Sequence, residues 1–307
     1  MDCQPSGLLP PPWVASLLGG AARLHTGVVQ GGGELSLDIT YGEGFCLLSV
    51  RAEGVRGLGR TDFQAVTTRA YRCIAAELPE GYQPVRLWNH IPGIHDDLRD
   101  PGGEGLDRYM VFNAGRFEAL AEWLGRESFD TRIASASGVG HGGQDLVLHC
   151  LAADQPGRAV ANPRQTAPYR YSQKYGPHPP CFARATVIEP PAGARGAPPL
   201  VLVGGTASIV GEESLHPGDL ARQTDETLTN LAVLLRAAAG APAPAAGERA
   251  AILAGFRELR VYVPDPGWGE PLCGLLQDAV PASHPSSGST PISAGGSFWW
   301  RSKDWRS

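Results

Sequence analysis

The chain has 307 residues, of which 42% are hydrophobic and 19% charged, enough for a substantial core and for two domains. Its net charge of −5 argues against a nucleic acid or an anionic membrane as partner, because both require a basic surface. No apolar run reaches the roughly 18 residues of a membrane span, and the proline-rich N-terminus lacks the basic start of a signal peptide, so we expect a cytoplasmic protein.

The hydrophobic pattern predicts an α+β fold, because each half of the chain offers strands, then a helix, then a further strand. In the first half it predicts strands at residues 35–39, 44–50, 83–91, 133–137 and 145–152, and helices at residues 61–78 and 116–124. In the second half it predicts strands at residues 182–189, 200–203 and 259–263, and helices at about residues 219–240 and 270–279. We therefore expect two domains, at residues 1–155 and 156–280.

After Val280 the composition changes abruptly to a serine-rich stretch with three tryptophans and no regular period. Residues 281–307 are therefore predicted to form an aberrant, disordered tail. The predicted helix at residues 270–279 then has no following strand, so we expect the second domain to lack its closing strand.

Six scattered cysteines without a CxxC pair indicate free, mostly buried thiols rather than a disulfide framework or a zinc site. The acidic residues show no HExxH or DxDxG spacing, so no metal site is predicted. Cys181 has no suitably spaced histidine base, because His178 is too close in sequence, and we interpret it as a structural thiol.

The segment at residues 162–186, NPRQTAPYRYSQKYGPHPPCFARAT, concentrates arginine, lysine and tyrosine within an acidic chain. Its five prolines stiffen the backbone and rule out a long helix. Arginine binds carboxylates through two parallel hydrogen bonds and tyrosine hydroxyls donate further ones, so the segment suits a small dianion. A proline-rich surface connector with solvated charges is the other interpretation, and composition alone does not separate the two.

Two further stretches suggest ligand contacts. Tyr109 to Arg116 (YMVFNAGR) is predicted to lie at a transition from strand to helix. The helix dipole disfavours an arginine at a helix start unless an anion lies beside it, which favours an anion contact over a solvated arginine. Gly204 and Gly205 follow a predicted strand, where small residues let a ligand approach the backbone closely.

The glycine-rich stretch Ser137 to Gln144 (SGVGHGGQ) follows a predicted strand. It lacks the GxxxxGK[ST] pattern of a phosphate-binding loop and is followed by another strand rather than a helix. We therefore predict a tight hairpin with glycines at positive φ, from which His141 could project into a cleft.

Five segments resemble the chorismatase family: VRLWNHIPGI, YMVFNAGR, SASGVGHGGQDLVLHCLA, the 162–186 segment, and LVGGTASIVGEESLHPGDLARQTDETLTNL. The resemblance implies two RidA/YjgF-like (chorismate mutase-like) α+β domains with mixed sheets packed against helices, and an active site between them. It also implies a cofactor-free reaction that releases pyruvate from chorismate. Members of this family are also labelled pteridine-dependent deoxygenase-like.

Carried over motif by motif, the resemblance implies that the substrate-binding positions are Tyr109, Arg116, Tyr171, Arg184, Gly204 and Gly205. Chorismate is a dicarboxylate, so two arginine–tyrosine pairs match its two charges. The family's general acid is a glutamate in a C-terminal strand of the form Cys-Arg-x-Glu-Leu-Leu-Val-Glu-Ile-Glu-Gly. This chain has no glutamate after Glu270, so no catalytic residue can be assigned to it as written.

A shifted reading frame would account for both the missing strand and the missing acid. Residues 298–303 (FWWRSK), read one base earlier, can give Leu-Val-Glu-Ile-Glu when Arg301 is encoded by AGR and Ser302 by TCN. Together, residues 294–303 can give Cys-Arg-Arg-Glu-Leu followed by Leu-Val-Glu-Ile-Glu in the same frame. We therefore expect the chain after about Pro281 to be a frameshifted version of the family's last strand.

The resemblance predicts a chorismatase that releases pyruvate with either 3-hydroxybenzoate or a dihydroxycyclohexadiene carboxylate, impaired if the frameshift is real. A monomer is expected, because two RidA-like halves share one chain. Two alternatives stay open. One is a non-catalytic protein that binds a small chorismate-like anion, and the other is an imine deaminase like the RidA relatives.

Overall fold

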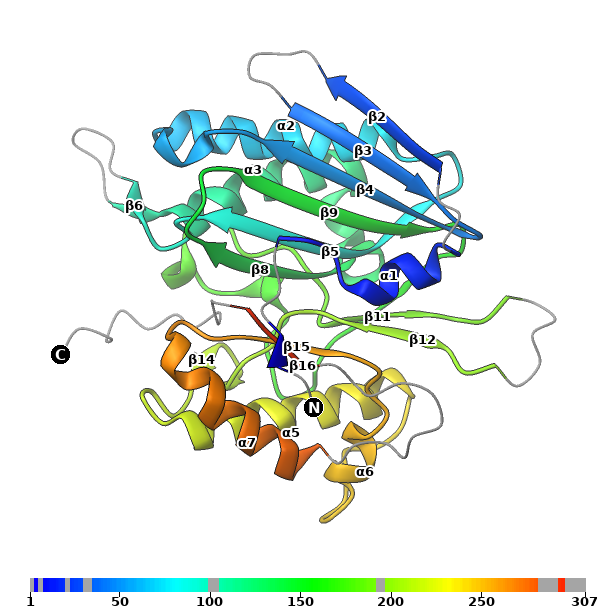
Figure 1. Ribbon diagram of the computed structural model, residues 1–307, viewed down its shortest axis with the longest axis vertical. Helices are drawn as coiled ribbons and strands as arrows, with labels where there is room; N and C mark the ends of the chain where they lie inside the picture. The colour runs from blue at the N-terminus through cyan, green and yellow to red at the C-terminus, as the bar shows by residue number, and fades with distance from the viewer. Residues whose placement is uncertain are drawn as a thin grey trace. The chain divides into compact units, whose positions relative to one another are not determined.

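The computed structural model describes residues 3–4, 8–19, 23–29, 35–98, 105–191, 197–280 and 292–295. The chain divides into two compact units, each built from segments that are not continuous in sequence. The larger unit consists of Pro10–Ala159 and Ala167–Gly204, and the smaller unit consists of Met1–Leu9, Val160–Thr166 and Gly205–Ser307. Both units contain helices and strands, which agrees with the predicted α+β class (Figure 1).

A six-stranded mixed sheet forms the larger unit, with its strands in the order β2-β3-β4-β9-β5-β8 (Figure 1). Neighbouring strands are antiparallel except for β5 and β8, which run parallel. The strands are β2 (Arg23–Val29), β3 (Leu35–Tyr41), β4 (Phe45–Ala52), β5 (Gln83–Pro92), β8 (Ser135–His141) and β9 (Leu146–Ala153). The five strands predicted for the first half are confirmed, and β2 is an additional edge strand.

Two helices, α2 (Arg60–Glu77) and α3 (Arg108–Leu124), lie side by side against one face of this sheet (Figure 1). The strands bury alternate apolar side chains there, such as Leu48 of β4 and Cys150 of β9, and Phe63 of α2 packs in the same layer; each of the three is 0% exposed. Each such side chain stabilises the fold by roughly 1.5–3 kcal/mol. This packed layer holds α3 rigidly against the sheet.

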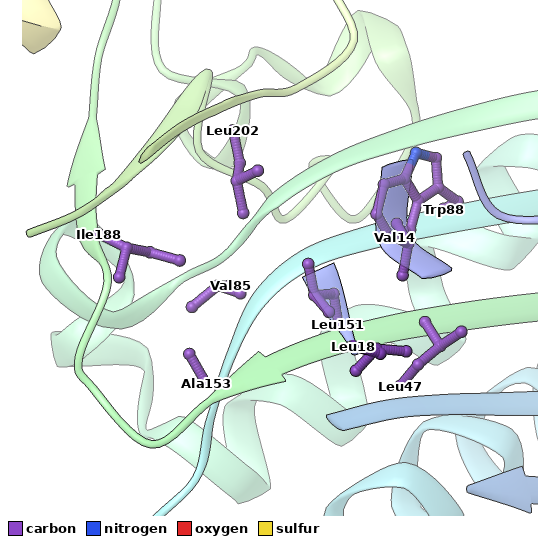
Figure 2. Packing of buried hydrophobic residues seen from close by; sticks show 9 residues of the cluster. All are labelled: Val14, Leu18, Leu47, Val85, Trp88, Leu151, Ala153, Ile188 and Leu202. Atoms are coloured by element: carbon purple, nitrogen blue, oxygen red, sulfur yellow. The ribbon is translucent and has the colours of Figure 1, made fainter. Parts of the chain in front are cut away.

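The helix α1 (Pro12–Leu17) packs a small apolar cluster onto the sheet. Figure 2 shows Val14 and Leu18 beside Leu47, Trp88 and Leu151. These sheet residues alternate with the ones that face α2 and α3, so the cluster covers the opposite face.

The helix α3 begins earlier than predicted, because Asp107 caps it. The Asp107 carboxylate accepts a hydrogen bond from the backbone N–H of Met110 at 2.8 Å. The predicted transition from strand to helix between Tyr109 and Arg116 is therefore wrong, since both residues lie inside the helix. Seven residues separate them, which is about two turns, so they share one face of α3.

The predicted hairpin at Ser137 to Gln144 is also wrong, because β5 lies between β8 and β9 and pairs with both. Residues 137–141 instead continue β8 alongside residues 88–92 of β5. None of the glycines in this stretch has a positive φ. Every residue of β5 after Gln83 is buried, as expected for a central strand covered on both faces.

The smaller unit contains the helices α5 (Leu220–Ala238), α6 (Arg249–Leu253) and α7 (Gly269–Ala279). Three of its strands pair in parallel in the order β1-β16-β15, namely β1 (Cys3–Gln4), β16 (Ile292–Gly295) and β15 (Leu259–Tyr262). A strand therefore does follow α7, and the prediction that this unit lacks its closing strand is wrong. Hydrogen bonds between backbone groups hold paired strands together. Such a pair can therefore form without the hydrophobic pattern from which strands are predicted. The predicted disorder of residues 281–291 and 296–307 lies outside the described residues.

Short elements complete the fold. They are α4 (Phe129–Arg132), β6 (Asp97–Leu98), β7 (Leu106–Asp107), β10 (Arg158–Val160), β11 (Ala185–Ile188), β12 (Leu200–Val203), β13 (Ile209–Val210), β14 (Glu213–Ser214) and five 3-10 turns at Val55–Gly57, Arg126–Ser128, Pro168–Arg170, Gln173–Tyr175 and Pro266–Trp268. In the described part of the chain, no helix is both long and apolar enough to cross a membrane.

The cysteine prediction is confirmed in part. The free cysteines of the described residues are all buried and are Cys46, Cys73, Cys150 and Cys181. Cys273 is disulfide-bonded, contrary to the expectation of free thiols throughout.

Candidate functional site

Arg116 lies in the middle of α3 with 1% of its surface exposed. Its Nη2 donates a hydrogen bond to Asn113 Oδ1 at 2.9 Å. Its guanidinium carbon lies 5.3 Å from the ring centroid of Phe112, and the group also hydrogen-bonds the Tyr71 hydroxyl. None of these three neighbours is a carboxylate.

The positive charge of Arg116 is therefore not neutralised by an acidic side chain among the described residues. Burial by itself would lower the pKa of Arg116, but attraction to Tyr71, Tyr109 and Cys181 outweighs burial and raises it. The guanidinium stays protonated. Burying an unpaired ion costs several kcal/mol, so this position strongly favours the arrival of an anion.

Arg184 is also buried, with 3% of its surface exposed. Its Nη2 donates to the Tyr171 hydroxyl at 2.5 Å, and its guanidinium carbon lies 5.9 Å from the ring centroid of Tyr171. Arg170 and Lys174, in the same segment, are solvent-exposed. The interpretation as a solvated surface connector therefore fits those two residues but not Arg184.

Phe182 links the two arginines. Its ring centroid lies 5.9 Å from the guanidinium carbon of Arg116 and 5.3 Å from that of Arg184. Both cations therefore contact one aromatic ring, although they come from α3 and from a loop that is more than 60 residues further along. Tyr109 adjoins the same cluster, since it contributes to the charge environment of Arg116.

Comparison with known protein families agrees with the resemblance found in the sequence. Residues 29–152 match the family model described as "Chorismatase FkbO/Hyg5-like, N-terminal". The resemblance to chorismatases is confirmed. The matched residues include most of the sheet of the larger unit together with α2 and α3, and so contain Tyr109 and Arg116.

One relative with a curated name is called a 3-hydroxybenzoate synthase, and another is called a chorismatase. A 3-hydroxybenzoate synthase of Streptomyces hygroscopicus is 37% identical over 201 residues, which cover 64% of this chain and 56% of that protein. A chorismatase of Streptomyces rapamycinicus is 36% identical over 159 residues, covering 51% of this chain and 45% of that protein. The chain thus spans about half the length of the curated relatives that it matches.

A solved structure supports the fold. The crystal structure of a chorismatase superposes with a TM-score of 0.69 and 23% sequence identity, over 90% of this chain and 76% of that chain. At this level of identity the likeness concerns the chorismatase fold alone.

Gly204 and Gly205 directly follow β12; Gly204 is the last residue of its segment of the larger unit, and Gly205 begins the next segment of the smaller unit. The Gly204 N–H donates to the Arg184 carbonyl at 2.7 Å. A Cβ on Gly204 would meet the carbonyl oxygens of Ala183, Ala136 and Arg184 at 2.9–3.1 Å. Close backbone packing is thus a sufficient reason for this glycine, and the predicted contact with a substrate ring stays a prediction.

Cys181 lies near Arg116 but is unsuited to nucleophilic chemistry. Burial raises its pKa to about 12, and the nearby Arg116 lowers it only in part. Its Sγ lies 3.4 Å from the Pro179 carbonyl oxygen. The thiol therefore stays protonated at neutral pH, which agrees with its interpretation as a structural residue.

His141 ends β8, where its Nδ1 accepts a hydrogen bond from the Gly143 N–H at 3.1 Å. Burial lowers its pKa, so the ring is neutral at neutral pH. No contact joins it to Arg116 or Arg184 among the described residues. The described part of the chain also contains no group of three or more metal-ligating side chains.

Three residues of the cluster were missed by sequence reasoning: Tyr71, Asn113 and Phe182. Asn113 lies within the YMVFNAGR motif, and Phe182 precedes Arg184 in the basic segment, so both stood next to predicted residues. Tyr71 had no local signal, because it is an apolar-face residue of a different helix and reaches Arg116 only through the packing of α2 on α3.

Proposed function

We propose that this chain is an enzyme of the chorismatase type, which binds chorismate and cleaves its enolpyruvyl ether to release pyruvate. The observation that carries the proposal is the buried, charged Arg116, which has no carboxylate partner among the described residues. The names of the curated relatives, a 3-hydroxybenzoate synthase and a chorismatase, support the choice of substrate.

The two arginines are assigned to the two carboxylates of chorismate. Arg116 holds one carboxylate with Tyr109 nearby, and Arg184 holds the other with the Tyr171 hydroxyl. In this proposal Gly204 and Gly205 line the space for the ring. The protein acts as a cytoplasmic monomer.

Cleavage requires a proton on the methylene carbon of the enolpyruvyl group. Water then adds to the adjacent carbon, and the ring oxygen leaves as that carbon becomes the carbonyl of pyruvate. Tyr71 and Cys181 are too weakly acidic for the first step, since burial raises the pKa of both, that of Cys181 to about 12. We assign the proton to a glutamate of the in-frame C-terminal strand, and the reaction needs no cofactor.

The two candidate ring products come from reactions that differ in the amount of water consumed for each chorismate. Release of the dihydroxycyclohexadiene carboxylate consumes one water for each chorismate. Release of 3-hydroxybenzoate consumes none overall, because the ring loses water as it becomes aromatic. The relative from Streptomyces hygroscopicus is named for the second reaction, as a 3-hydroxybenzoate synthase.

The deciding experiment offers chorismate to two purified proteins, the chain as written and a chain whose last strand is restored in the shifted frame. Pyruvate is followed with a coupled assay, and the ring product is separated by chromatography. We expect pyruvate from the restored protein and at least a hundredfold less from the chain as written, because the acid is absent from it.

Each other outcome has a distinct meaning. Chorismate binding without pyruvate from either protein would favour the anion-binding alternative. Ammonia release from enamine substrates would favour the imine deaminase. If neither protein binds chorismate, the proposed function is wrong.

A further inference from the structure

A chain of hydrogen bonds leads from the sheet to Arg116. Asn89 Nδ2 donates to the Ser137 carbonyl of the neighbouring strand at 2.8 Å. Asn89 Oδ1 in turn accepts from the Tyr71 hydroxyl at 2.6 Å. The Tyr71 hydroxyl also hydrogen-bonds the Arg116 guanidinium. Asn89 and Tyr71 are both 0% exposed, so no solvent competes for these bonds.

The direction of each bond follows from the chemistry of the amide. Since the NH2 group of Asn89 is used by the Ser137 carbonyl, its oxygen must face Tyr71, and the phenol must be the donor. The Tyr71 oxygen is then left as an acceptor for Arg116. Tyr71 keeps its proton, because burial raises its pKa more than the nearby Arg116 lowers it.

The orientation of the Asn113 amide follows from the same kind of reasoning, applied to its hydrogen bond with Arg116. Its Oδ1 accepts from Arg116 Nη2 at 2.9 Å, so its NH2 group must point away from that bond. Asn113 Nδ2 and Arg116 Nε are both buried, and neither has a hydrogen-bond partner among the described residues. Two donors three residues apart on α3 therefore lack acceptors, although both side chains are nearly inaccessible to water.

We propose that Asn113 is a ligand-contacting residue, which donates its amide hydrogen to the same carboxylate that Arg116 binds, and that Tyr71 and Asn89 are positioning residues that hold the guanidinium for it. Neutral acceptors are essential to this arrangement. Tyr71 and Asn113 orient Arg116 without neutralising it, so the full charge is kept for the ligand. The substitution Asn113→Asp would orient the guanidinium equally well but would neutralise its positive charge.

This reasoning gives a test with opposite effects on stability and binding. In Asn113→Asp the new carboxylate pairs with Arg116, so we expect the melting temperature without ligand to rise. Binding of chorismate and of benzoate, measured by calorimetry, should weaken at least tenfold. Gln173→Glu, which adds the same charge at an exposed position, is the matched control and should change neither quantity.

The positioning role is tested with Tyr71→Phe, which removes only the hydroxyl. We expect the dissociation constant for benzoate to rise about tenfold and, in the chain with the restored strand, KM for chorismate to rise with little change in kcat. Tyr82→Phe, at a partly exposed position away from Arg116, is the control. A general loss of structure would instead lower kcat and the melting temperature together.

The inference rests on the proposed function only for the identity of the anion. If Asn113→Asp binds both ligands as well as the wild type, or is less stable than the wild type, the inference is wrong. If the wild-type chain binds chorismate or benzoate but releases no pyruvate even with its strand restored, the proposed function fails and the inference stands. If it binds neither anion, both fail.

Discussion

Two buried arginines of α3 have nearly the same exposure but very different surroundings. Arg108 is 2% exposed and donates to the backbone carbonyls of Val55 and Arg56 at 3.3 and 2.7 Å, with Asp96 at 4.0 Å. Arg116 has no such carbonyls and no acidic neighbour among the described residues. Arg108 therefore stabilises the fold by joining α3 to the segment at Val55 and Arg56. Arg116 instead keeps its charge available for an external anion.

The two arginines should therefore respond differently to the same substitution. We expect Arg116→Met to change the free energy of unfolding by less than about 1 kcal/mol, because removing the cost of a buried, unneutralised charge offsets the lost hydrogen bonds to Asn113 and Tyr71. Carboxylate binding should be lost. Arg108→Met, the matched control, should cost about 2–3 kcal/mol, since it removes both hydrogen bonds that Arg108 donates to the carbonyls of Val55 and Arg56. Urea unfolding and calorimetry with benzoate measure both quantities. A cost above 2 kcal/mol for Arg116→Met would contradict this account of its charge.

At the scale of elements, the position of α3 on α2 decides where Arg116 lies. The helices approach closely at Gly115, where a Cβ would meet the Gln64 carbonyl oxygen at 2.6 Å and the Thr67 Cβ at 2.9 Å. The Thr68 hydroxyl also donates to the Gly115 carbonyl at 3.3 Å. A residue with any side chain at position 115 would push α3 away from α2 and move the guanidinium with it.

Adding a single methyl group at position 115 tests whether α2 and α3 are packed as closely as this. We expect Gly115→Ala to lower the free energy of unfolding by about 1–3 kcal/mol, because the new atom collides with backbone as well as side chain. Gly274→Ala in α7 is the control, since a Cβ there meets nothing within 4 Å. That change should instead stabilise by up to about 1 kcal/mol through helix propensity. Denaturant unfolding of both variants makes the comparison, and equal effects at the two positions would refute the close-packing argument.

At the scale of the whole molecule, the C-terminal region connects the structure to the proposed reaction. The strand β16 (Ile292–Gly295) pairs with β15, so a short closing strand forms even from the residues ISAG. It contains no carboxylic acid. Closure of the sheet and supply of the acid are therefore separate properties, although the sequence had suggested a single absence for both.

The reading-frame hypothesis makes a definite prediction about the gene. Read one base earlier, the codons for residues 294–303 should give Cys-Arg-Arg-Glu-Leu followed by Leu-Val-Glu-Ile-Glu. This requires an AGR codon for Arg301 and a TCN codon for Ser302. Sequencing the nucleotides decides the matter. A CGN codon at position 301 would replace the glutamate that follows the valine of the restored strand by alanine and would refute the hypothesis.

The two arginine–tyrosine pairs came from the family resemblance, and their role in binding stays a prediction. The sequence alone determined the class of the fold and the positions of the strands that were predicted in the first half. These features depend on local periodicity and on motifs, which are written in neighbouring residues. It did not predict that α3 starts at Arg108, because Tyr109 to Arg116 was interpreted as a transition from strand to helix and the cap at Asp107 was not recognised. Nor did it predict that β5 separates β8 from β9, since strand order is set by pairing between distant segments.

Only the tertiary structure revealed how the charge of Arg116 is surrounded. Tyr71 reaches it from α2 and Phe182 from a distant loop, so neither contact follows from spacing along the chain. The absence of an acidic partner among the described residues is likewise a property of three-dimensional packing. Composition shows how many carboxylates a chain contains, but only the fold decides which cations they reach, because burial and distance set the energy of a charge.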